Sequence, residues 1–101
     1  MAENPLSIFE KLDPRLLNLI KNNHELALSE GSLSKKNKLL IAMALDASLG
    51  ASKGVKSLAQ AALGAGATKE EIIEALRVAY YICGVSCVYA AAEAFRDLFE
   101  H

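Results

Sequence analysis

The sequence has no excess of charge of one sign. Its 11 Lys and Arg residues oppose 12 Asp and Glu residues, which gives a formal net charge of −1 at pH 7. A protein that binds DNA or RNA through phosphate groups needs a basic face, and this spread of charges does not supply one. A polybasic membrane anchor is excluded for the same reason. We therefore expect neither nucleic acid nor a membrane among its partners.

The sequence also lacks an apolar run long enough to cross a bilayer. The longest stretch without a charged residue covers residues 78–92, and as a helix it would fall short of a hydrocarbon core of roughly 30 Å. We interpret it as a buried segment. The first residues carry Glu3 and Pro5 where a secretory signal would have a basic start and an apolar run. A cytoplasmic location is therefore expected.

Cysteine is scarce. Cys83 and Cys87 are the only two, and at four residues apart on one helix their Cβ atoms would be about 5–6 Å apart, whereas a disulfide needs about 3.8 Å. His24 and His101 stand alone, so no Cys or His pair has the spacing of zinc ligands. We expect no disulfide, no metal and no cofactor.

No alternation of β-branched residues is long enough for a strand, and Ala and Leu make up about a third of the chain. The sequence therefore predicts an all-α fold of about six helices in a single domain over residues 1–101, arranged as an oligomeric bundle. Residues 6–12 suit a short helix or turn that covers an apolar edge of the domain. The longer helices are expected at about 14–29, 35–47, 52–63, 68–82 and 85–99.

Several helix ends carry sequence signals. Asp13 is a suitable N-cap because Pro14 follows it at the first helical position. Thr68 and Glu71 have the spacing of a capping box, and Gly84 marks the last break between helices. Ser34 is a further N-cap candidate. The inward stripe of the helix at 14–29 is predicted to be Leu17, Ile20, His24 and Leu28, and that of the last helix Val88, Ala91, Ala92, Phe95 and Phe99.

The chain carries more apolar surface than a small monomer can bury. Two adjacent helices have no free polar face, and the run at 39–45 is the clearest case. A domain of this size buries only about 60–65% of the surface of its unfolded chain. We therefore expect a homo-oligomer.

Residues 61–76, AALGAGATKEEIIEAL, are preceded by Leu33-Ser34-Lys35 and followed by the apolar segment 80–92. This pattern resembles the carboxymuconolactone decarboxylase and AhpD-like alkylhydroperoxidase family, over about residues 8–99. The resemblance implies an all-α fold that assembles as a trimer or as a hexamer made of two trimers. It also implies a family-level antioxidant activity, namely peroxiredoxin or alkylhydroperoxidase activity.

AhpD-like enzymes use a Cys-x-x-Cys-x-x-x-His motif and a Glu on the preceding helix. In an ungapped alignment the two Cys positions fall on Ala51 and Gly54, the His position on Leu58 and the Glu position on Leu39. A peroxidatic cycle needs a thiolate, a resolving thiol and a base. The decarboxylase branch keeps a His at the Leu58 position, so this chain departs from both branches. We expect a family member without the usual catalytic groups.

Other residues could still carry chemistry. Cys87 is expected in the first turn of the last helix, with Ser86 as its cap, where the helix dipole would lower the pKa of a thiol. The favoured alternative is that Cys83 and Cys87 are small apolar fillers.

Asp46, Ser48 and Tyr81 are candidates for a ligand pocket. A carboxylate such as Asp46 could bind a proton or a ligand amine. The commoner outcome is that it pairs with Lys53 or caps the turn from Ser48 to Lys53.

Three functions are compatible with these residues. The chain could be an AhpD-like peroxidase, a non-catalytic oligomer that binds a small apolar or acidic ligand, or an oligomeric scaffold. No sequence pattern separates ligand binding from scaffolding.

Overall fold

The structure is a computed structural model that describes residues 4–100. In this range the chain forms a 3-10 turn and six α-helices and contains no strand, which confirms the all-α prediction. The elements are η1 (Pro5–Ile8), α1 (Phe9–Leu12), α2 (Pro14–Leu28), α3 (Lys35–Ser48), α4 (Ser52–Gly64), α5 (Lys69–Cys83) and α6 (Ser86–Phe99).

Local capping explains where three of the helices begin. The Asp13 carboxylate accepts a hydrogen bond from the Leu16 amide at 3.0 Å and begins α2. The Thr68 hydroxyl accepts from the Glu71 amide at 3.1 Å, and the Glu71 carboxylate accepts from the Thr68 amide at 2.8 Å. The capping box predicted for α5 is therefore present. Ser34 caps α3 as predicted. These contacts satisfy amides that have no partner within the helix.

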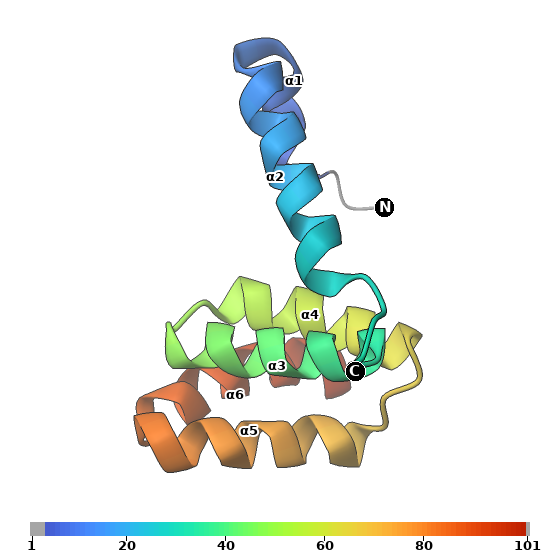
Figure 1. The fold of residues 1–101 in the computed structure, drawn as a ribbon. Coiled ribbons are helices and arrows are strands. Elements are labelled where there is room, and N and C mark those ends of the chain that lie inside the picture. Colours follow the sequence, from blue (N-terminus) through green and yellow to red (C-terminus); the bar gives the residue numbers. More distant parts are fainter. Residues whose placement is uncertain (1–3, 101) are drawn as a thin grey trace.

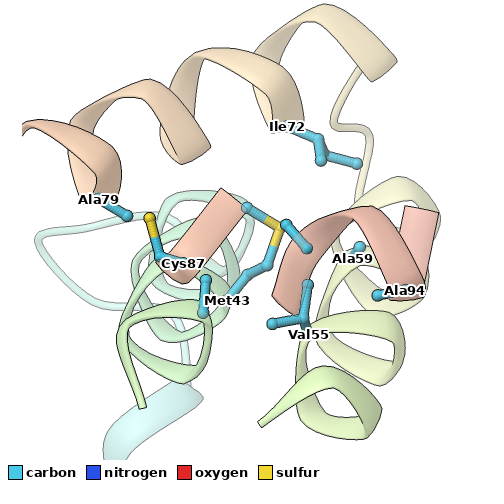
Figure 2. Packing of buried hydrophobic residues seen from close by; sticks show 9 residues of the cluster. Met43, Val55, Ala59, Ile72, Ala79, Cys87 and Ala94 are labelled. Atoms are coloured by element: carbon cyan, nitrogen blue, oxygen red, sulfur yellow. The ribbon is translucent and has the colours of Figure 1, made fainter. Parts of the chain in front are cut away.

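Helices α3 to α6 form a four-helix bundle, in which α3 packs against α4 and α5, and α6 packs against α4 and α5 (Figure 1). Met43, Ile72, Val55 and Cys87 are its largest fully buried side chains, and Figure 2 shows them between the helices. The remaining buried positions of this core are all alanines, so the helices approach closely. A second, smaller cluster contains Leu39, Ala62 and Ala67.

Helix α2 stands away from this bundle and meets it at α3 (Figure 1). η1 and α1 fold back along α2, so the prediction that residues 6–12 cover the bundle is wrong. Leu17 is the only buried residue of α2, and His24 is exposed, contrary to the predicted stripe. The physical reason is that most of α2 has no bundle surface beside it. Ala92 on α6 is also exposed rather than inward.

Two ion pairs join helices across the bundle. Lys36 on α3 and Glu71 on α5 are 2.9 Å apart, and Lys56 on α4 and Asp97 on α6 are 3.7 Å apart. All four side chains are at least partly open to water, so each pair contributes little to stability. Their main effect is to favour one register of the helices.

Candidate functional site

The four positions to which the family motif aligns lie on α3 and at the start of α4. Leu39 is buried, and Leu58 is half-buried and packs against the cluster that contains Leu39. Ala51 is the N-cap residue of α4, and Gly54 lies in its first turn. Leu58 also packs against the main core. Leu, Ala and Gly therefore occupy these four positions, and none of them can exchange a proton or attack a peroxide.

Gly54 is in close contact with Asp46 of α3. A β-carbon added at position 54 would lie 2.9 Å from the Asp46 carboxyl carbon and closer still to one of its oxygens. Real Cβ atoms do not approach another atom this closely, so no side chain can stand at position 54 while Asp46 keeps its place. The Asp46 carboxylate thus occupies the space where the side chain of the family's second cysteine would begin.

The contacts of Asp46 show neither of the two structural roles expected for its side chain. Among residues 4–100 its carboxylate forms no ion pair with Lys53, and the ion pairs found there involve other residues. The backbone carbonyl of Asp46, rather than its side chain, closes the turn into α4 by accepting from the Ala51 amide at 2.9 Å. Gly50 permits this turn because its φ is +75°.

An apolar groove of about 350 Å³ lies between α3 and α5. We call it the α3–α5 groove, and its lining is Ile41, Ala44, Leu45, Ser48, Val78, Ala79, Ile82 and Cys83. The Cys83 thiol donates to the Ser48 hydroxyl at 3.0 Å, and this hydroxyl donates to the Ala44 carbonyl at 3.1 Å. The few polar atoms in its wall therefore already have partners.

Of the three predicted pocket residues, Ser48 lines the α3–α5 groove and Asp46 and Tyr81 do not. Tyr81 is 84% exposed. The apolar residues that shape the groove were not singled out from the sequence. Ile41 and Leu45 are four residues apart, as are Val78 and Ile82, and two such pairs on neighbouring helices are a signal that could have located it.

The two thiols are in different environments because Gly84, with a φ of +82°, ends α5 between them. The break predicted at Gly84 is therefore present, and Cys87 lies in the first turn of the last helix as expected. Both are free, with Cys83 exposed and Cys87 buried. Burial raises the pKa of the Cys87 thiol, and the nearby Cys83 raises it further. Thiolate chemistry at Cys87 requires a lowered pKa, so the shift is in the opposite direction. Ser86, which was expected to cap α6, is not its cap, because the N-cap is Val85.

The remaining surface offers no stronger site. A larger depression, of about 470 Å³, lies where α2 meets α3, but its walls are mostly exposed polar side chains. No group of three His, Cys, Asp or Glu side chains in the described part of the chain could hold a metal ion. No helix within residues 4–100 is long and apolar enough to span a membrane.

The fold and the site define a small all-α protein built on a four-helix bundle with a separate N-terminal helix. Residues 12–97 match the sequence model of the carboxymuconolactone decarboxylase family. The chain therefore belongs to this family. No curated protein sequence matches it.

A solved structure supports the same assignment. It is the apo form of a carboxymuconolactone decarboxylase family protein from Legionella pneumophila, which is 33% identical to this chain. The alignment covers 95% of this chain and 88% of the other, with a TM-score of 0.86. A likeness of this extent includes α2 as well as the bundle.

Proposed function

We propose that this chain is a homo-oligomeric scaffold of the carboxymuconolactone decarboxylase family and that it has no thiol peroxidase cycle at the usual motif position. The exposed apolar face around the α3–α5 groove carries the proposal. Ile41, Leu45, Val78 and Ile82 all project there with about half or more of their surface exposed. A contiguous apolar surface of this kind on a small protein is typical of a subunit interface.

The total surface and the shape of the chain support assembly. Its accessible surface is 7283 Å², whereas a compact monomer of this mass exposes roughly 5,500 Å². Its radius of gyration is 14.3 Å, compared with about 12.7 Å for a compact domain of this length. The chain therefore exposes far more surface than a compact monomer, and further copies of the chain could cover it. By family resemblance we propose a trimer or a hexamer.

Peroxidase activity, which the family resemblance implies, has little support from the thiols. The pKa of Cys87 is raised by burial, so Cys87 is a poor nucleophile. Cys83 is exposed, and its thiol donates a hydrogen bond to the Ser48 hydroxyl rather than to a base. With the aligned motif positions filled by hydrocarbon, we propose no catalytic turnover of hydroperoxides.

Binding of a small ligand is the second candidate, and the α3–α5 groove is the observation that favours it. The groove is apolar with a hydroxyl and a thiol in its wall. It would suit a small apolar molecule with one hydrogen-bonding group. We rank it second because the groove opens onto the apolar face that we assign to subunit contacts.

Analytical ultracentrifugation and a hydroperoxide assay test the proposed function together. We expect a trimer or hexamer at micromolar concentration and no saturable reduction of an organic hydroperoxide, with or without a dithiol donor. A double variant, Cys83→Ser with Cys87→Ala, is expected to behave like the parent in the assay. A folded monomer would contradict the assembly, and cysteine-dependent saturable turnover would contradict the absence of catalysis.

Titration with an apolar fluorescent probe separates the two candidates. A scaffold with its groove covered by a neighbouring subunit should bind little probe as an intact oligomer. Saturable binding of one probe per chain to the intact oligomer, lost in Ala44→Phe, would favour the ligand-binding candidate, because a large side chain there fills the groove.

A further inference from the structure

We propose that α2 is an arm exchanged between subunits, with its exposed leucines docked in the α3–α5 groove of a second copy of this chain. The inference rests on the proposed homo-oligomer and names the two surfaces that meet. The arm carries Leu16, Leu19 and Leu26, all exposed, along one side of α2. Leu26 is 82% exposed and Leu19 is 57% exposed.

An isolated α2 has little reason to be stable. It has 15 residues and buries only Leu17, and a helix of that length is marginal in water without tertiary packing. The exposed leucines are spaced three and seven residues apart, so they lie on one face, whereas Asn18 lies outside that face. An amphipathic helix with its apolar face in water indicates a missing partner.

The same chain does not supply that partner. Leu28 at the end of α2 packs against the cluster that contains Leu39, and Lys38 Nζ donates to the Ser29 carbonyl at 2.6 Å. These contacts hold the base of the arm against the start of α3. From there α2 leaves the bundle on the side away from α5 (Figure 1). Its leucines therefore do not reach the groove of their own subunit.

The α3–α5 groove has the shape and chemistry to receive such a helix. Helices commonly dock in apolar grooves through apolar side chains on one face, and Leu16, Leu19 and Leu26, at i, i+3 and i+10, share one face of α2. Ala44 and Ala79 line the groove and leave room between the larger side chains of α3 and α5. No charged side chain lines the groove. On the arm, Arg15 is exposed and adjoins Leu19, so its guanidinium would stay in water at the edge of the contact.

The excess accessible surface of each chain is large enough for a stable contact between subunits. The accessible surface exceeds that of a compact monomer by about 1,800 Å² per chain. Obligate interfaces bury roughly 2,000–5,000 Å² over both partners, or about half of that on each. Because every copy has one arm and one groove, arm exchange covers both surfaces in any closed assembly, whether a reciprocal dimer or a head-to-tail ring. A ring of three subunits meets this condition.

Disulfide trapping tests the contact, because the native Cys83 already lines the groove and is exposed. Leu16→Cys, Leu19→Cys and Leu26→Cys each add one thiol to the arm, and Asn18→Cys adds one outside the leucine face as the matched control. After oxidation with diamide, at least one leucine variant should give a covalent dimer or larger species on a non-reducing denaturing gel. Asn18→Cys should not, and adding Cys83→Ser should abolish the product.

The outcomes separate the inference from the proposed function. If no leucine position forms an intermolecular disulfide while sedimentation still shows an oligomer, the arm contact is wrong and the homo-oligomer stands. An intramolecular disulfide would mean that the arm occupies its own groove, which also overturns the proposal. A monomeric parent would overturn both.

Charge substitution provides a second readout that does not depend on oxidation. Leu19→Asp should weaken assembly at least about ten-fold in sedimentation, because the docked leucine would become a buried charge. Asn18→Asp should leave assembly unchanged, and circular dichroism should show that both variants keep their helices. The proposal would be contradicted if Leu19→Asp assembled as well as the parent. It would also be contradicted if the arm bound a different protein in place of a second copy of this chain.

Discussion

The carboxylate of Asp46 lies against the α-carbon of Gly54, in the space that a β-carbon at position 54 would need. This contact joins the end of α3 to the first turn of α4. It occurs at the position where the ungapped alignment with AhpD-like enzymes places a cysteine. Asp46 and Gly54 are therefore coupled, and a cysteine at position 54 would have to displace the Asp46 side chain.

The first prediction concerns this pair. Gly54→Ala should destabilise the protein by about 1–3 kcal/mol, the usual cost of overpacking, because the new methyl group displaces Asp46. In an Asp46→Ala background the same change should be neutral or stabilising by up to about 1 kcal/mol, since Ala favours a helix more than Gly. Denaturant unfolding of the four proteins measures the coupling. Equal effects in both backgrounds would show that the contact does not matter.

The second prediction concerns acid stability. The hydrogen bond from Lys36, together with the backbone hydrogen bond from Thr68, lowers the pKa of Glu71 below its ordinary value of 4.5. Because the pKa is lower in the folded state, Glu71 stabilises the fold above about pH 4.5, and this contribution is lost as the pH falls through the folded-state pKa. Glu71→Gln should flatten this part of the profile of unfolding free energy against pH. Glu70→Gln is the matched control, and an equal effect of both variants would refute the assignment.

The third prediction concerns the two thiols. Cys83 is exposed, whereas Cys87 is buried and its pKa is raised. A thiol reagent at pH 8 should modify Cys83 readily in the dissociated subunit and leave Cys87 unmodified until the chain unfolds. Cys83→Ser should remove the accessible thiol without exposing the other. Fast labelling of Cys87 in the folded Cys83→Ser variant would show that the core around α6 is open.

The fourth prediction concerns Leu58, which is half-buried. It still packs against both clusters, so Leu58→Ala should cost about 2–3 kcal/mol, in the lower part of the range for Leu to Ala changes. Leu49→Ala, at a position that is 80% exposed, should stay within about 0.5 kcal/mol of the parent. A loss below about 1 kcal/mol at Leu58 would favour an open pocket over a sealed core.

Leu58→His tests the same site for activity. The imidazole would lie beside Leu39, where AhpD-like relatives have a carboxylate, so it would lack a partner. The variant should be less stable than the parent and should gain no hydroperoxide turnover. Restored turnover would mean that the hydrocarbon at this site is the only barrier to catalysis.

The sequence alone determined the positions of the helices and the family. Asp13, Ser34 and the Thr68–Glu71 pair act on amides within three residues of themselves, so their effect can be predicted locally. The excess of apolar residues could also be counted without a structure. These properties do not depend on which helices become neighbours.

The tertiary structure decided which surfaces of those helices meet. Cys83 and Cys87 lie on either side of a break that the sequence predicts, yet only the packing of α6 into the bundle decides that Cys87 is buried while Cys83 is exposed. His24 fits an inward stripe by spacing, but it is exposed because the bundle does not extend beside α2. The contact of Asp46 with Gly54 and the α3–α5 groove exist only because α3 packs against both α4 and α5. Burial and close approach depend on packing between distant segments, and helical periodicity carries no information about that packing.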